Sequence, residues 1–472
     1  MMNKYVLIII LYSFVMVLVG YFFTRHSRVK DAKDFFVARR SLDTKLLFST
    51  LLASNIGAGS TIGLAGLAYK FGISAWWWIG ASGLGSIFLA YWVGPRIYRI
   101  AKEKGFLTLG DYLEFRYSKA FRGFISLLMG VGTLAILGGQ LLAIAWILEV
   151  ISGLSKVYGV LLGAGVIVIY SAMGGLFSAV AVNMLQIIVK MFGFTFAAIF
   201  AYIAVGGFSG LIEKSAEVAE RSATLFSPGG IGLSVIIGYF LMLTPSFCVS
   251  SGLIGKVYGA KDESTVKKGT ALNGAAQWVF GVLIVFIGMS AYAMMPDLSN
   301  SEHALPSAII NLMPLWVAAL ALASIFSAEV STCDALLYMI AGAWVNDFYK
   351  GLFNPTISSV RLLFLGRVAM ICGGGIAIIF ALCLDSIISA LTIFYTLMSV
   401  CLTAPVFFGL FTKIADSRAA FLSSAVGVIV TIIFRYFTEA KIWILNAQST
   451  GILFSLILMT FYCLWLKRCR IA

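Results

Sequence analysis

Residues 53–61 read Ala-Ser-Asn-Ile-Gly-Ala-Gly-Ser-Thr and lie in the middle of an otherwise apolar run at 46–68. A run of this length can cross a bilayer as a helix, because about 20 apolar residues span the hydrocarbon core. Small and polar residues at mid-depth interrupt such a helix, and an interrupted membrane helix is tolerated only where protein or water surrounds its freed backbone groups. The stretch therefore predicts a broken helix inside a polytopic membrane protein.

The composition of the whole chain agrees with this prediction. Of 472 residues, 61% are hydrophobic and 11% are charged, against about 45–50% and about 25% in soluble domains. This excludes a soluble enzyme, a disordered regulator and a disulfide scaffold, and the continuous apolar runs disfavour a β-barrel. We predict an all-α fold with thirteen spans, at about 5–23, 46–68, 75–95, 123–152, 157–173, 181–206, 231–252, 271–295, 314–346, 362–383, 386–411, 419–437 and 448–467.

The net charge of +14 is distributed unevenly along the chain. If the N-terminus lies outside, 26 of the 34 Lys and Arg residues fall in loops on the cytoplasmic side, in the C-terminal tail or, for Arg367, just inside a span at that side. Cationic residues concentrate in short cytoplasmic loops, so the bias predicts an N-out, C-in topology. The charge is thus an orientation signal that also contacts lipid headgroups, and we expect no nucleic-acid partner.

A second interruption predicts an internal repeat. The seventh span contains Thr244-Pro245-Ser246, where proline removes a backbone donor and clashes with the preceding turn. The two breaks are five spans apart, which fits a five-plus-five inverted repeat with the binding site near the midplane; the alternative is that glycine and proline are simply common in membrane helices. We divide the chain into a first helix and basic loop (1–45), two repeats (46–206 and 231–411) and a terminal pair of helices (412–472).

The ninth span carries a polar stripe. On a helix, Ala328, Ser331 and Thr332 stand in the i, i+3, i+4 relation and share one face. Two hydroxyl oxygens beside a helix carbonyl could form half of a sodium site, because hard cations take oxygen ligands. The alternative is that both hydroxyls bond to their own helix or to a neighbouring one.

Three motifs together resemble the sodium:solute symporter family, over roughly residues 5–467. They are Gly174-Gly175-Leu176 continuing to Asn183-Met-Leu-Gln186, the pair Ser331-Thr332 followed by Asp347-Phe-Tyr-Lys350, and Asp34-Phe-Phe-Val-Ala-Arg-Arg-Ser-Leu42. The resemblance implies a leucine-transporter-type core of ten helices, with one extra helix before it and two after it. That number agrees with the thirteen spans counted independently.

The resemblance also implies a sodium site between the second and ninth spans. Backbone carbonyls of Ala53 and Ile56 would face the Ala328 carbonyl and the hydroxyls of Ser331 and Thr332. The family carries an aspartate where this chain has Asn183, so a second sodium site is in doubt and one sodium per solute is favoured.

Three ionisable residues lie inside predicted spans, where a charge is costly and faces a partner or a cavity. Glu329 and Asp334 stand about 100° to either side of the polar stripe, so neither is expected to bind the ion directly. Lys190 lies near mid-depth in the sixth span. Glu329 could pair with Lys190 and add proton coupling or gating, or the two could be a purely structural pair.

The substrate pocket is expected between the two breaks and the third, fourth and ninth spans. A sugar is disfavoured because Ile79 and Ser60 stand where the family's sugar transporters carry Glu and Gln, and a small carboxylate-bearing solute fits better, with its anion at a half-helix N-terminus. The run Trp76-Trp77-Trp78 is interpreted as an interfacial aromatic belt, with the alternative that these rings line the pocket. The predicted lining residues are Asn55, Ser60, Thr61, Gln140, Thr244, Ser246 and Asn273.

These observations predict a sodium-coupled secondary transporter of the plasma membrane that imports a small polar solute, an organic acid or an amino-acid-like molecule, by alternating access. Its partners would be the solute, sodium and membrane lipid, with no organic cofactor and no obligatory protein partner. No catalytic triad, metal-ligand set or phosphate-binding loop indicates an enzyme. The alternatives are a proton-coupled or ion-independent carrier on the same fold, and a transporter-like sensor.

Overall fold

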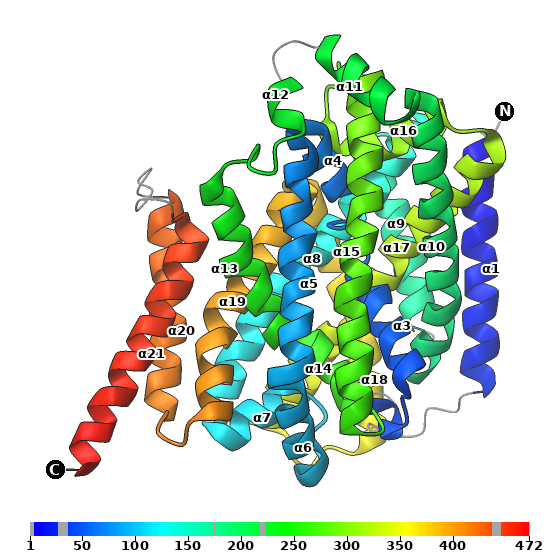
Figure 1. Ribbon diagram of the computed structural model, residues 1–472. Helices are drawn as coiled ribbons and strands as arrows, with labels where there is room; N and C mark the ends of the chain where they lie inside the picture. Colours follow the sequence, from blue (N-terminus) through cyan, green and yellow to red (C-terminus); the bar gives the residue numbers. More distant parts are fainter. Residues whose placement is uncertain (1–3, 27–35, 173–175, 218–221, 437–444, 472) are drawn as a thin grey trace.

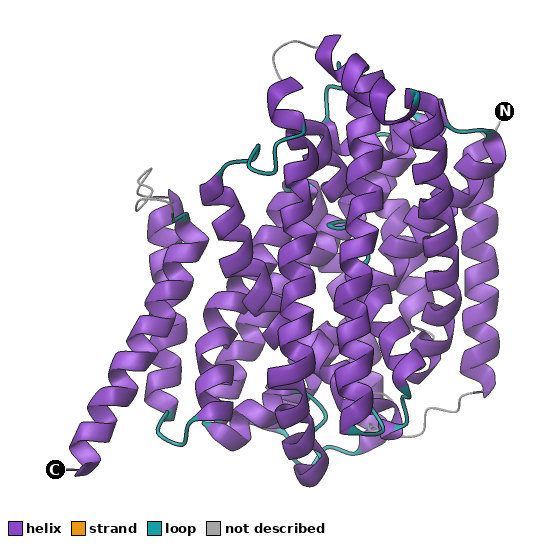
Figure 2. Cartoon of the chain, in the orientation of Figure 1, coloured by secondary structure: helices purple, strands orange, loops and turns teal. Residues whose placement is uncertain are grey.

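The computed structural model of this chain is mainly helical. It describes residues 4–26, 36–172, 176–217, 222–436 and 445–471. Figure 2 shows them running side by side as a bundle, with loops mainly at its two ends. In these ranges ten helices are long and apolar enough to cross a membrane. The predicted all-α polytopic class is confirmed. Four residues of the sequence motifs, Asp34, Phe35, Gly174 and Gly175, lie outside the described residues.

The predicted break in the second span separates two helices, α3 (Thr44–Asn55) and α4 (Ile62–Phe71). Ile56 takes an extended conformation (φ −94°, ψ 91°), which ends α3. Some of the freed backbone groups of the break are satisfied locally, since Ser60 N and Thr61 N both donate to Gly57 O, at 3.0 and 3.1 Å. Residues 56–66 are buried, so the interrupted backbone is enclosed by protein, as a membrane interior requires.

The seventh span is also broken, but at a different residue from the predicted one. Pro245 lies inside α13 (Leu233–Val249), and the chain turns at Ser250 before α14 (Ser251–Tyr258). A proline removes one backbone donor and leaves its own conformation helical. The backbone of Ser250 (φ −53°, ψ 121°) is no longer helical, and its side chain accepts a hydrogen bond from Leu253 N as the cap of α14.

The two broken helices lie among long, continuous ones (Figure 1). α15 (Glu263–Met294) packs against α3, α4 and α5 (Trp76–Phe88). α10 (Leu176–Val205) packs against α17 (Leu315–Ala341), and α8 (Lys119–Ser152) packs against α19 (Ile387–Phe411). The interface between α3 and α17 is therefore deep in the bundle.

The remaining helices surround this core. α1 (Lys4–His26) lies at one edge, and α20 and α21 form a pair at the opposite edge (Figure 1). The N- and C-terminal ends of the described chain lie at opposite ends of the bundle in the same view. The other helices are α6 (Gly94–Lys104), α7 (Leu109–Arg116), α9 (Lys156–Ala172), α11 (Gly207–Glu217), α12 (Ser222–Leu225), α16 (Ala304–Leu312), α18 (Ser359–Cys383), α20 (Ser417–Tyr436), α21 (Ala447–Ile471) and a π-helical segment after α17 (Gly342–Phe353).

Candidate functional site

Oxygen atoms from α3 and α17 meet at the break. Ser331 Oγ donates to Ala53 O at 2.8 Å and is 3.1 Å from Ala328 O. Thr332 Oγ1 donates to Ile56 O at 3.3 Å. All five residues are buried, so the residues predicted to hold sodium lie together, and we refer to their five oxygen atoms as the oxygen cluster.

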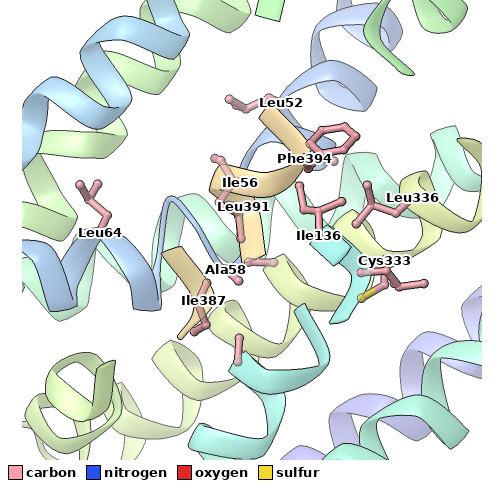
Figure 3. Close-up of a cluster of buried hydrophobic side chains, with 14 of the residues drawn as sticks. Leu52, Ile56, Ala58, Leu64, Ile136, Cys333, Leu336, Ile387, Leu391 and Phe394 are labelled. Atoms are coloured by element: carbon pink, nitrogen blue, oxygen red, sulfur yellow. The ribbon is translucent and has the colours of Figure 1, made fainter. Parts of the chain in front are cut away.

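The break approaches α17 closely enough to require glycine. A Cβ on Gly57 would lie 2.4 Å from Thr332 Oγ1, and one on Gly59 would lie 2.1 Å from Leu391 Cδ2. Figure 3 shows the apolar side of this region, where Ile56 and Ala58 lie among side chains of α19. The glycines that interrupt the helix in the sequence thus also allow its backbone to reach the neighbouring helices.

The ammonium group of Lys190 lies at the oxygen cluster. Lys190 extends from α10, is fully buried, and donates to Ser331 Oγ at 2.6 Å, Ala53 O at 3.1 Å and Ile56 O at 3.3 Å. Its hydrogen-bond partners are therefore neutral oxygens. Lys190 and Glu329 interact electrostatically, as considered from the sequence, but neither is a hydrogen-bond partner of the other.

Glu329 is directed to the other side of the break. Its Oε1 accepts from Thr61 Oγ1 at 3.0 Å, and Thr61 Oγ1 lies 2.9 Å from Gly57 O. Thr61 immediately precedes the first turn of α4, where the helix dipole favours a negative charge. The prediction that Glu329 is not a direct ligand of the cluster agrees with this geometry.

Asn183 and Asp334 lie away from the oxygen cluster. Asn183 is buried on α10, and its Nδ2 donates to Thr50 Oγ1 at 3.3 Å, one turn before Ala53 on α3. Asp334 is half-buried on α17 and interacts electrostatically with Lys256. In the described part of the chain, no group of three or more His, Cys, Asp or Glu side chains is placed to hold a metal ion.

A cavity adjoins the cluster and opens between α3, α5, α8, α14, α17 and α19. Asn55, Ser60 and Gln140 line it, as predicted. The side-chain amide of Gln140 is hydrogen-bonded, because its Oε1 accepts from Ala58 N at 2.8 Å. Trp78, a candidate lining residue from the sequence, lines it as well. Residues that the prediction missed also line it, including Ser82, Ser250, Lys256, Phe394 and Tyr395.

Four predicted lining residues make other contacts and do not line this cavity. Thr61 holds Glu329, Thr244 Oγ1 donates to Ala81 O at 2.9 Å, and Ser246 Oγ donates to Tyr395 O at 2.7 Å. Asn273 Oδ1 accepts from Asn55 Nδ2 at 3.2 Å and so supports a lining residue. Hydroxyl and amide groups near a break satisfy backbone groups as readily as they face a solute, and sequence does not separate these two uses.

Trp78 belongs to the cavity wall and not to an interfacial belt. Its ring is 3% exposed and meets Tyr239 edge-on, with ring centroids 5.1 Å apart. The neighbouring Trp76 and Trp77 direct their indole N–H groups to the carbonyls of Trp278 and Pro228. The interpretation of the three tryptophans as a belt is therefore wrong for Trp78.

Lys256 brings a positive charge to the cavity. The sequence places it in a basic loop, but it lies in α14 and is 3% exposed. Its Nζ donates to Thr50 O at 2.9 Å, one turn away from the oxygen cluster. The signal that could have identified it is the break at Ser250, which turns the chain back into the bundle.

The two ends of the bundle are held by different charged groups. At the end with α7, Arg122 bonds Asp111, Glu114 and Asp347 at 2.7, 2.6 and 2.9 Å. At the other end, Glu302 accepts from Trp146 Nε1 at 2.9 Å and Ile387 N at 2.8 Å, and burial raises the pKa of its carboxyl. Both groups join helices that flank the cavity.

The chain matches the model of the sodium:solute symporter family over residues 35–427. It is 24% identical over 371 residues to a symporter of Escherichia coli, YidK, covering 73% of this chain and 62% of that protein. It is 25% identical over 476 residues to the sodium/glucose cotransporter of Vibrio parahaemolyticus, covering 92% and 84%. A solved Na⁺-coupled sialic acid symporter, in a substrate-bound outward-open state, superposes with a TM-score of 0.80 at 20% identity, covering 97% of both chains. The leucine-transporter-type fold is confirmed.

Proposed function

We propose that this chain, which belongs to the sodium:solute symporter family, imports a small carboxylate-bearing solute together with sodium by alternating access. It is a multi-pass membrane transporter and not an enzyme. The observation that carries the proposal is the oxygen cluster beside the cavity, where two hydroxyls of α17 meet the carbonyls of the broken helix. Hard cations prefer such oxygen ligands, and a cation there joins the broken helix to α17 beside the solute.

The solute class is inferred from the charge at the cavity. Lys256 lines the cavity together with Asn55, Ser60 and Gln140, and its side chain is buried. Its ammonium donates to Thr50 O and interacts electrostatically with Asp334. A solute carboxylate that reaches the ammonium would form a charge-assisted hydrogen bond, which contributes to both the affinity and the orientation of the solute. The aromatic wall around Trp78 and Tyr395 suits the apolar part of a small molecule. An organic acid or an amino-acid-like molecule meets these requirements better than an uncharged sugar.

The same reasoning supports an orientation in the plasma membrane with the N-terminus outside. Cations of short loops gather on the cytoplasmic side, and the cation-rich helix α6 lies at the same end of the bundle as the C-terminus (Figure 1). That end is the one held by Arg122. Labelling of single cysteines introduced in the 96–122 and 297–302 segments with an impermeant reagent in intact cells tests this orientation, which requires reaction only at 297–302.

A two-step experiment tests the transport function. Purified protein is first heated with a panel of small acids, amino acids and sugars, with and without sodium, because a ligand at about 100 times its Kd adds about 2.7 kcal/mol to stability. The stabilising solute is then followed into proteoliposomes with an inward sodium gradient. We expect an acid to stabilise the protein and to accumulate only with the gradient. Accumulation of a sugar alone contradicts the solute class, and accumulation of no solute contradicts the transport function.

The variant Lys256→Met tests the role of the buried ammonium. We expect the apparent affinity for the acid to fall at least about tenfold, a loss of about 1.4 kcal/mol. The uncharged amide of the same solute serves as the matched control, because its affinity should differ little between wild type and variant. Equal loss of affinity for acid and amide means that Lys256 shapes the cavity without binding the carboxylate.

A further inference from the structure

Lys190 and a sodium ion make use of the same oxygens. Three of the five oxygens in the cluster, from Ser331, Ala53 and Ile56, accept hydrogen bonds from Lys190 Nζ. A sodium ion held by the cluster would stand where this nitrogen stands. We propose that Lys190 is a tethered competitor of sodium, whose ammonium fills the ion position until it is displaced. This inference rests on the proposed function for the identity of the ion.

The chemistry of an ammonium suits the position. Lysine offers three N–H donors and no acceptor, and three oxygens surround Nζ at 2.6 to 3.3 Å. Ammonium and sodium are both compact, strongly hydrated cations with one positive charge, and neutral oxygen dipoles that stabilise one also stabilise the other. The donors of Lys190 are used fully by the residues that were predicted to hold the ion.

The five oxygens of the cluster carry no formal charge with which to hold two cations together. Glu329, the carboxylate next in sequence to Ala328, interacts electrostatically with Lys190, but its hydrogen bond goes to Thr61 Oγ1 and not to the cluster. Two unit charges a few ångströms apart in a buried site repel strongly. Lys190 and sodium therefore exclude each other, and the ion binds only when the lysine leaves.

The close packing of α10 against α17 places Lys190 at this position. Three residues further along α10, a Cβ on Gly193 would lie 1.9 Å from Ser324 Oγ and 2.8 Å from Leu320 O of α17. The absence of a side chain at Gly193 therefore brings α10 directly against α17. From that distance the fully buried Lys190 side chain reaches across α17 to the end of α3.

A tethered competitor has a mechanical consequence. The break in the second span and α17 are bridged by a positive charge whether or not sodium is bound, because Lys190 contacts both helices. When sodium departs, the ammonium returns and donates hydrogen bonds to the oxygens. Without it these buried oxygens would lack hydrogen-bond donors, which costs free energy. The lysine thus lowers the affinity for sodium and keeps the site assembled between cycles.

The experiment measures sodium binding directly and needs no solute. Purified wild type and Lys190→Met are titrated with radioactive sodium in a scintillation proximity assay, with choline holding the ionic strength constant, and sodium-induced thermal shifts are recorded in parallel. Methionine keeps most of the length of the side chain without its charge. We expect the variant to bind sodium at least about tenfold more tightly than wild type. Sodium binding that is measurable in the variant but too weak to measure in wild type supports the proposal as well.

Lys256→Met is the matched control, since it also removes a buried lysine but one whose Nζ contacts Thr50 O and not the cluster. Its sodium affinity should rise by much less than that of Lys190→Met. Equal gains in both variants mean that general repulsion, and not competition for the same oxygens, sets the affinity, and this overturns the proposal. Unchanged or weaker sodium binding by Lys190→Met overturns the proposal as well. If Lys190→Met does not fold, Lys190→Gln is measured in its place. Failure of solute transport with tighter sodium binding overturns only the proposed function.

Discussion

Arg122 and Lys190 are both buried cations, but their surroundings are opposite. Arg122 meets three carboxylates, from Asp111, Glu114 and Asp347, at the end of the bundle. Lys190 meets a hydroxyl and two carbonyls in its interior. A guanidinium compensated by full negative charges is a fixed structural element, because removing either side leaves uncompensated charge. The hydrogen bonds of Lys190 go only to neutral oxygens, although Glu329 also attracts its charge, and an ammonium held in this way can be exchanged for another cation.

The connections of Arg122 extend this difference. Its Nη2 also donates to Asn346 O at 2.8 Å, and Asp347 accepts a hydrogen bond from Thr108 beside it. The group thereby joins α8, the start of α7 and the π-helical segment after α17. We infer that the Arg122 group fastens one end of the bundle, while the site around Lys190 is built to change its occupant.

The largest expected effect comes from Arg122→Met. The variant leaves three carboxylates close together without their cation, and breaking a buried ion pair in this way costs about 3–5 kcal/mol. Thermal unfolding in detergent, with chemical denaturation for the free energy, measures the loss. Arg122→Lys is the control, because it keeps the charge but loses the planar fork and should lose less stability. A wild-type unfolding temperature for Arg122→Met means that Arg122 is not a structural fastener.

A smaller effect is expected from Ser331→Ala, which removes the shortest contact of Lys190. Hydrogen bonds to charged groups contribute about 1.5–3 kcal/mol, so we expect a loss near the lower end of that range when sodium is absent. The same change in a Lys190→Met background should cost about 1 kcal/mol less, because the ammonium is no longer there to be held. Equal costs in the two backgrounds mean that Ser331 does not act through Lys190.

The smallest effect is expected from Glu114→Gln. The Glu114 side chain is 28% exposed, against 11% for Asp347, and water screens its interaction with Arg122. Such partly exposed pairs contribute about 1 kcal/mol or less. We therefore expect a modest decrease in unfolding temperature that grows at low salt. A loss as large as that of Arg122→Met indicates that the three carboxylates act as one inseparable group.

Much of the oxygen cluster was predictable because its parts are local in sequence. The i, i+3, i+4 spacing of Ala328, Ser331 and Thr332 places them on one helix face, and the glycines after Ile56 mark the break. The resemblance to the family supplied the facing carbonyls, and the contacts of Ser331 with Ala53 and of Thr332 with Ile56 agree with it.

The cavity was predicted less well, for a physical reason that its residues illustrate. Thr244 and Asn55 are both polar side chains beside a break, yet one bonds a backbone carbonyl of α5 and the other faces the cavity. Lys256 was assigned to a loop because the apolar run of the seventh span ends at residue 252, whereas the helix α14 that carries it begins at Ser251 and packs against α3 and α17.

The sequence by itself determined the membrane class, the first break and the polar face of α17, because each depends on apolar length or helical period within a few turns of chain. Only the tertiary structure decided that Lys190, more than 130 residues from both Ala53 and Ser331, would place its ammonium on the oxygens of both. The direction of a long, flexible side chain depends on how closely its helix packs against the next one. For α10 and α17 that closeness is set at Gly193, by contacts with residues far away in the chain.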